Sequence, residues 1–248
     1  MGLIKNENDI RAMAESGRIA ALILKELVGA VRPGVTTRQL NELAVRRIKE
    51  EGVAPSFLNQ DGFPAVLCTS VNDVIVHGVP SDVELQEGDT VGLDFGVIYE
   101  GWHSDTAVTV PVGEVSFEAK RIMDVAKRAL RLGIKKARPG ATTGDIGNTI
   151  QRFVEGEGYS VVRELVGHGI GRELHEDPQV PNYGRRGSGE VLKAGMVIAI
   201  EPMIIDGTAD LKLAPDGFGY ASPSGALTAH FEHTIVITEE GPVILTKA

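Results

Sequence analysis

The strongest constraint in this sequence is a six-residue phrase that occurs twice. RPGVTT occupies residues 32–37, and RPGATT occupies residues 138–143, an offset of 106 positions. At the same offset, segments 38–52 and 144–158 both place apolar residues at i, i+4 and i+8, which is one stripe of an amphipathic helix. A common way of starting a helix explains the phrase alone, but not the longer match. The sequence therefore favours an internal duplication that folds as two related halves.

Each repeat carries the signals of a capped helix. Thr36 with Gln39 fits a capping box, and Thr142 with Asp145 imitates it. Each helix is then expected to end at a glycine, because glycine adopts the left-handed turn that commonly follows a helix. These two glycines are Gly52 and Gly158.

The elements around the two repeats recur in the same order. A further helical stretch precedes each copy, over about 7–30 in the first half and about 117–136 in the second. Strand-like runs follow each pair, and 87–94 matches 194–201 at an offset of 107. No Pro- or Ser-rich linker separates the halves. This order predicts α+β architecture with pseudo-twofold symmetry.

Length and composition bound the rest. We expect one catalytic domain over 1–248, with halves of about 1–113 and 114–248. The net charge of −9 argues against nucleic acid as the main partner, since phosphates demand Lys and Arg. No apolar run reaches the roughly 18 residues of a membrane span, and the N-terminus lacks an apolar signal core. Together with the single Cys68, this predicts a cytoplasmic protein without a membrane partner, monomeric by default.

Two acidic residues interrupt a predicted hairpin over residues 90–110. A two-residue turn at 99–100 would place Asp94 directly opposite Asp105, whereas a turn at 100–101 would make them diagonal neighbours on one face. A three-residue loop would put Asp105 on the other face. Two carboxylates on one buried face repel, so a cation is expected between them. The two strands contain no Lys or Arg, which favours a divalent metal ion over a side-chain cation.

Three further residues of ligand type end or interrupt apolar strands. His168 lies in the Gly-rich VGHGIG, Glu201 ends AIE and is the repeat partner of Asp94, and Glu232 lies within AHFEHTIVIT. Singly, each is more often a turn cap, a solvent-facing carboxylate or a structural histidine. Together with Asp94 and Asp105 they form an oxygen-rich set with one imidazole, which suits Mn, Fe(II) or Co. Four carboxylates exceed the needs of one ion, so two ions are expected.

Four segments in this order resemble type I methionine aminopeptidases: LDFGVIYEGWHSDT, GHGIGRELHEDPQVPNY, AIEPM and FEHTIVIT. The resemblance covers nearly the whole chain and implies the pita-bread fold. In this fold two pseudo-symmetric halves form an antiparallel sheet flanked by helices, and they surround a dimetal centre. Only 33 residues separate His168 from Glu201 and 31 separate Glu201 from Glu232, which leaves no room for the insertion typical of type II. The chain begins at the first helix, so we expect no zinc-finger extension of the kind found in some eukaryotic relatives.

The resemblance also implies roles for individual residues. His175 would contact the scissile amide region, His77 would position the substrate, and Asp105 and Glu232 would bridge both ions. The implied metal ligands are Asp94, Asp105, His168, Glu201 and Glu232. The implied lining of the methionine pocket is Phe63, Cys68, Leu174 and Phe218, for which ordinary core packing is the alternative.

Two positions depart from the family pattern. Gln60 stands where relatives often carry an aromatic pocket residue, and Ser104 replaces a common glycine. His230 and His233 flank a ligand position and could hydrogen-bond to the metal ligands, and His103 has no predicted role.

The implied reaction is removal of the initiator methionine from nascent proteins and peptides, near the ribosome, when the second residue is small. The resemblance implies attack of a water activated by two divalent ions, Co, Mn or Fe(II), with Zn or Ni also compatible. Glu201 would take the proton of that water. Two alternatives stay open: a proline-directed peptidase, which usually carries an additional N-terminal domain, and a non-catalytic binding protein, which typically lacks metal ligands.

Overall fold

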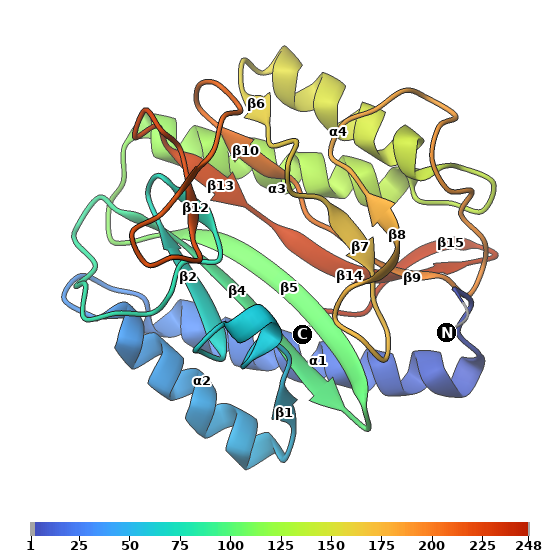
Figure 1. Ribbon diagram of the computed structural model, residues 1–248, viewed down its shortest axis with the longest axis horizontal. Helices are drawn as coiled ribbons and strands as arrows, with labels where there is room; N and C mark the ends of the chain where they lie inside the picture. The colour runs from blue at the N-terminus through green and yellow to red at the C-terminus, as the bar shows by residue number, and fades with distance from the viewer. Residues whose placement is uncertain (1–2, 248) are drawn as a thin grey trace.

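The computed structural model describes residues 3–247, and within them two pairs of α-helices flank a large sheet. Figure 1 shows α1 and α2 along the lower side of the sheet, and α3 and α4 along the upper side. The helices are α1 (Glu7–Ala30), α2 (Thr37–Glu51), α3 (Phe117–Lys136) and α4 (Thr143–Gly156). The helices expected over 7–30 and 117–136 are therefore confirmed. None of the helices in the described part of the chain could span a membrane.

The start of the second helix of each pair is a capping box in both halves. Thr36 accepts a hydrogen bond from the Gln39 backbone and donates its own N–H to the Gln39 side chain, 3.0 Å away. Thr142 and Asp145 repeat this exchange, with Thr142 N–H donating to Asp145 Oδ2 over 3.0 Å. Both predicted helix starts are thus confirmed.

The helix ends differ slightly between the halves. Gly52 caps α2 directly with a positive φ of 67°, as expected. In the second half α4 ends at Gly156, and the left-handed residue is Gly158, with φ 89°, two positions later. The glycine stop is present in both copies, but one more residue of turn precedes it in the second.

One antiparallel sheet joins strands from both halves of the sequence. Its order is β1-β4-β5-β14-β9-β7-β8, with β2 paired to β4 and β15 to β14. The seam lies between β5 and β14, where Glu232 pairs with Ala107 and His233 with Thr106. The strands are β1 (Ala54–Pro55), β2 (Leu67–Val71), β4 (Thr90–Tyr99), β5 (Trp102–Pro111), β7 (Gly167–Gly169), β8 (Glu176–Val180), β9 (Val197–Ile200), β14 (Glu232–Thr238) and β15 (Gly241–Ile244).

Two three-stranded sheets and one short 3-10 helix complete the fold. One sheet has the order β13-β10-β6 and the other β11-β12-β3. Their strands are β3 (Val74–Val76), β6 (Ser160–Val161), β10 (Met203–Ile205), β11 (Lys212–Leu213), β12 (Tyr220–Ala221) and β13 (Thr228–His230). The 3-10 helix η1 covers Gln60–Gly62.

The β4–β5 hairpin has the diagonal register. Tyr99 pairs with Trp102, so the turn residues are Glu100 and Gly101, both with positive φ. Of the two-residue turns that the sequence left open, the one at 100–101 is present and the one at 99–100 is not, and the three-residue loop is also excluded. The turn forms at Glu100 and Gly101 because a tight two-residue turn needs two positive φ angles in succession, which favours a glycine at its second position.

Two apolar cores fix which face of the sheet carries polar groups. The stripes predicted on α2 and α4 are buried, with Leu40 packed among residues of α1 and β4, and Ile146 among residues of α3 and β9. Along β4, Leu93 and Phe95 point into the first of these cores. Because side chains alternate along a strand, Asp94 between them points to the opposite face. The helices thus cover one face, and the acidic residues lie on the other.

Candidate metal centre and substrate pocket

Hydrogen bonds across the β5–β14 seam hold two carboxylates in place. Asp105 N–H donates to Thr234 Oγ1 over 3.0 Å, and that hydroxyl donates to the Asp105 carbonyl over 2.8 Å. Thr106 Oγ1 donates to the Glu232 carbonyl over 3.0 Å. The backbone at Asp105 and Glu232 is therefore held by side-chain hydrogen bonds as well as by the pairing of β5 with β14.

The glycines around His168 let the sheet close tightly at that residue. A Cβ on Gly167 would lie 2.5 Å from the Ala199 carbonyl oxygen, and one on Gly169 would lie 2.0 Å from that of Asp177. His168 Nδ1 lies 2.9 Å from the Gly169 carbonyl, which can only accept, so Nδ1 carries the proton. Nε2 is then left with a free lone pair, as a metal-ligating histidine requires.

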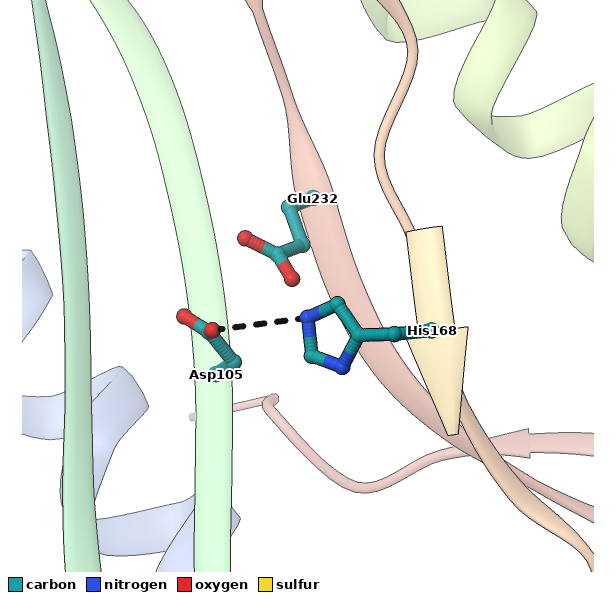
Figure 2. A group of neighbouring side chains, drawn as sticks. All are labelled: Asp105, His168 and Glu232. Carbon is teal, nitrogen blue, oxygen red and sulfur yellow. Dashed lines mark ion pairs between the residues drawn. The ribbon is translucent and has the colours of Figure 1, made fainter. Parts of the chain in front are cut away.

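Asp105, His168 and Glu232 point toward one another from three strands (Figure 2). They offer ligand atoms that all lie within 4.8 Å of one another. His168 Nε2 is 3.9 Å from Asp105 Oδ2 and 3.6 Å from Glu201 Oε1, where Glu201 directly follows β9. Asp94 lines the same pocket as these four residues. The structure thus brings together all five residues that the sequence suggested as ligands.

The carboxylates of this cluster are buried with too little positive charge around them. Burial, followed by the charge of Asp94, raises the pKa of Asp105 well above its usual value, and burial followed by Asp105 does the same for Glu232. Burial also raises the pKa of Asp94 to about 6. Among residues 3–247, no group hydrogen-bonds to Asp94 Oδ1, Asp105 Oδ1 or Glu232 Oε1. Such buried oxygens fit a divalent cation, which would compensate their charge and fill their lone pairs.

Glu201 differs from the other acids because histidines surround it. Burial raises its pKa, but the neighbouring His230 and His168 outweigh burial and leave the pKa below its usual value. His230 Nε2 lies 3.5 Å from Glu201 Oε2. Glu201 is therefore the carboxylate of the group that most readily stays ionised.

Two further histidines stand over the cluster. The His175 ring meets the His168 ring edge to face, with centroids 4.5 Å apart and planes at 87°. Desolvation, followed by the charge of His168, lowers the pKa of His175 to about 4. His77 has a strained φ of 60°, and burial lowers its pKa as well. Both imidazoles are therefore neutral at pH 7.

An apolar pocket adjoins the carboxylates. Its cavity volume is about 130 Å³, and Phe63 and Phe218 meet edge to face in its wall with their ring centroids 5.6 Å apart. Burial, followed by the charge of Asp94, raises the pKa of the Cys68 thiol well above its usual value, so the thiol is neutral. The eleven residues expected at the site all line this pocket: Phe63, Cys68, His77, Asp94, Asp105, His168, Leu174, His175, Glu201, Phe218 and Glu232.

Sequence reasoning missed two residues of the pocket wall, Phe57 and Asp61. Phe57 lies in the loop before η1, and Asp61 lies within η1 together with Gln60, another lining residue. Gln60 was noted as a departure from the family pattern, and its position next to Asp61 was the available signal. Since the segment has no regular periodicity, its inward-facing side chains could not be assigned from the sequence.

The second departure lies away from the pocket. Ser104 is fully buried and accepts a hydrogen bond from Ser16 of α1 over 2.9 Å. It therefore serves helix-to-sheet packing, on the face opposite Asp105. Two remaining histidines pair with hydroxyls, His103 Nδ1 with Ser56 at 3.1 Å and His233 Nδ1 with Thr246 at 2.9 Å.

The comparisons with known proteins agree with this geometry. Residues 11–239 match metallopeptidase family M24. A methionine aminopeptidase of Clostridium perfringens is 47% identical over 246 residues, which cover 99% of each chain. The chain belongs to the methionine aminopeptidases of family M24.

Solved structures place this M24 member in the pita-bread fold. A methionine aminopeptidase from Rickettsia prowazekii superposes with a TM-score of 0.96 at 43% identity, over 98% of both chains. A prolidase from Pyrococcus horikoshii superposes with a TM-score of 0.82 at 27% identity. That superposition covers 99% of this chain but only 64% of the prolidase chain. The predicted fold is therefore confirmed, and the chain is a metallo-aminopeptidase that uses divalent metal.

Proposed function

We propose that the protein removes the initiator methionine from nascent proteins and peptides whose second residue is small. The observation that carries this proposal is the buried group of four carboxylates and one imidazole at the base of an apolar pocket. The relatives named methionine aminopeptidase support the same substrate.

The residues that would hold the metal are Asp94, Asp105, His168, Glu201 and Glu232, which all line the pocket, and we infer that Asp105 and Glu232 would serve both ions. Their oxygen-rich set favours Co, Mn or Fe(II), and Zn or Ni are also compatible. When bound, the ions would supply a Lewis acid and lower the pKa of a bound water toward about 7. The exposed fractions of Asp105 and Glu232, 5% and 2%, keep bulk water from screening that charge.

The protein's own groups would handle the proton and the substrate carbonyl. Glu201, ionised at neutral pH, accepts the proton of the attacking water and helps to return it to the leaving amine. His175, neutral at pH 7, donates a hydrogen bond to the oxyanion that develops on the methionine carbonyl. His77 orients the peptide from the other side of the same pocket.

The pocket wall suits a methionine side chain. The perpendicular rings of Phe63 and Phe218 present both a face and an edge, with which a thioether sulfur makes favourable contacts. Leu174 and the neutral Cys68 add apolar surface without a charge. An adjoining groove shares His77, His168, His175 and Glu201 with the pocket, and we assign it to the rest of the peptide.

The setting of the reaction is part of the proposal. We infer one catalytic domain over residues 1–248, whose halves of about 1–113 and 114–248 arose by duplication. The protein would act as a monomer on nascent chains near the ribosome. The single Cys68, a buried free thiol, favours the cytoplasm.

Peptide hydrolysis tests this function. Purified protein is incubated with Met-Ala-Ser, with Met-Leu-Ser and with an X-Pro peptide, each with added Mn²⁺ and with a chelator. The proposal expects methionine release from Met-Ala-Ser alone, and none after chelation. Cleavage of the X-Pro peptide would assign a proline-directed peptidase instead, and no cleavage with any divalent ion would leave a binding protein.

A further inference from the structure

A buried ion pair lies beside the pocket, where Glu176 also lines the adjoining groove, and neither of its residues has been given a role in the reaction above. Lys5 Nζ lies 2.6 Å from Glu176 Oε2, and the exposed fractions of the two side chains are 4% and 14%. Taking two charges out of water is costly, and such a pair often stabilises a fold less than apolar side chains would. The pair therefore calls for a role other than overall stability.

Glu176 closes the loop that carries His175. Its Oε1 accepts the backbone N–H of Arg172 over 2.7 Å and that of Glu173 over 3.3 Å. The ion pair packs directly on the loop backbone, because a Cβ on Gly171 would lie 2.5 Å from Glu176 Oε1 and 2.7 Å from Lys5 Nζ. The carboxylate thus ties the start of loop 171–176 to its end, with Lys5 neutralising it.

The same loop is fastened to the hairpin that carries the acidic residues. His103 N–H donates to the Gly171 carbonyl over 2.8 Å, and Arg172 Nη1 donates to the Glu100 carbonyl over 2.8 Å. The Arg172 guanidinium stacks 3.9 Å from the centre of the Trp102 ring. The loop is therefore fixed to β5 at His103, which lies two residues before Asp105.

Lys5 connects this loop to a third segment. Its backbone N–H donates to the Gly195 carbonyl over 2.8 Å, shortly before β9, which Glu201 directly follows. The N-terminal segment thus joins the turn before β9 to the loop between β7 and β8. Both of these flank residues of the pocket.

We propose that Lys5 and Glu176 are positioning residues that hold His175 over the reacting carbonyl; this rests on the role proposed for His175. Without Glu176, the N–H groups of Arg172 and Glu173 lose their acceptor, and without Lys5 the buried carboxylate has lost its counter-charge. Either change frees the loop, so the His175 ring loses its edge-to-face contact with His168. A misplacement of about 1 Å at a catalytic group can cost about 100-fold in rate.

The test measures kcat and KM for Met-Ala-Ser with the Mn²⁺-loaded full chain. Lys5→Met and Glu176→Gln should each lower kcat about 10- to 100-fold with less than about a threefold change in KM. Lys5→Arg should restore most of kcat, because it keeps the buried positive charge. Arg38→Met, which breaks an exposed ion pair with Asp82, is the matched control and should be unchanged.

A double variant separates positioning from general destabilisation. In the His175→Ala background, Lys5→Met should lower kcat by less than about twofold further, because the residue through which it acts is gone. The inference is overturned if Lys5→Met lowers kcat in the His175→Ala background by as much as it does in the wild type. It is also overturned if both Lys5→Met and Glu176→Gln keep the wild-type kcat. If Lys5→Met does not fold, Glu176→Gln and its combination with His175→Ala decide in the same way.

The outcomes also distinguish this inference from the proposed function. If the wild type releases no methionine, or His175→Ala keeps full kcat, the proposed function or the role of His175 has failed. If both behave as proposed and only the Lys5 and Glu176 variants are unaffected, the positioning inference alone has failed.

Discussion

Asp94 and Asp105 lie on one face of the β4–β5 hairpin but two positions out of register. Asp94 pairs with Ala107, and Asp105 pairs with Gly96, so the two carboxylates are diagonal neighbours. A Cβ on Gly96 would lie 2.5 Å from the Ser104 carbonyl oxygen, which leaves no room for a larger residue in that close approach. The diagonal places both carboxylates in one pocket without setting them directly opposite each other.

Removal of divalent metal should destabilise the protein. A ligand present at 100 times its Kd stabilises the folded state by about 2.7 kcal/mol, which corresponds to about 5–10 °C in Tm for a chain of this size. We therefore expect a chelator to lower Tm by about this much and Mn²⁺ to restore it. Thermal unfolding with and without chelator is the measurement, and Ca²⁺ as the added ion is a control for nonspecific effects.

The stability of the metal-free protein should also depend on pH. The pKa values of Asp105 and Glu232 are raised in the folded chain, so between about pH 4 and those values the folded chain holds protons that the unfolded chain releases. Their contribution to stability is thus present at low pH and is lost as the pH rises through the folded values. For Asp94 that loss falls between about pH 4 and about pH 6.

Urea unfolding of the chelated protein between pH 5 and 8.5 measures this effect. Asp105→Asn is the comparison protein. The buried histidines change the stability with pH in the opposite direction, but they do so in both proteins and therefore cancel in the difference. The wild type should lose stability relative to Asp105→Asn as the pH rises. A difference between the two proteins that is constant across this range would contradict the account of the buried carboxylates.

Substitution of the proposed shared ligand should lower metal stoichiometry. Asp105→Ala removes an oxygen donor that lies 3.9 Å from His168 Nε2, and we expect fewer than two Mn²⁺ ions per chain and little methionine release. Equilibrium dialysis followed by metal analysis is the measurement. Unchanged binding of two ions would mean that Asp105 does not bridge them.

Substitution of His175 should separate catalysis from metal binding. His175→Ala removes a hydrogen-bond donor outside the ligand set, so kcat should fall about 100- to 1,000-fold while the metal content stays at the wild-type level. The test combines steady-state kinetics with metal analysis on one preparation. Loss of metal in this variant would make His175 a ligand instead.

Asp216 should couple the two walls of the pocket. Its carboxylate accepts from the backbone N–H groups of Phe218 and Gly219, at 2.9 and 2.7 Å, and from that of Val79 at 2.9 Å. Desolvation raises its pKa, but these bonds outweigh desolvation and leave the pKa below its usual value. Its stabilising contribution is therefore present above about pH 4 and is lost as the pH falls through the lowered value.

Asp216→Asn should raise KM about fivefold, the equivalent of about 1 kcal/mol, with a smaller effect on kcat. It should also reduce the loss of stability on acidification below about pH 4. Asp210→Asn, at an exposed carboxylate in the loop before β11, is the control. An equal response of the two variants would show that the bonds to Val79, Phe218 and Gly219 do not support the pocket.

The sequence predicted the elements whose signals are local. The Thr36 and Thr142 capping boxes, the four helices and the hairpin each follow from residues within a few positions of one another. The duplication added long-range information, since it made Glu201 the repeat partner of Asp94; Glu201 does follow the end of β9, but Asp94 lies within β4 and not at its end. These two sources, with the family resemblance, were sufficient to find all eleven expected residues in one pocket.

The parts that could not be predicted depend on contacts between distant segments. The hairpin register remained open between 99–100 and 100–101, because one residue of turn decides which side chains oppose each other. Phe57 and Asp61 lie in an irregular segment without periodicity. The pairing of Lys5 with Glu176 spans 171 positions and follows only from the packed structure.

Anomalous diffraction from crystals grown with Mn²⁺ tests the central claim most directly. We expect two Mn²⁺ peaks in the pocket, within coordination distance of Asp94, Asp105, His168, Glu201 and Glu232. A single peak elsewhere on the surface, or an empty pocket in crystals that bind Mn²⁺, would contradict the assignment of these five residues as a shared dimetal site.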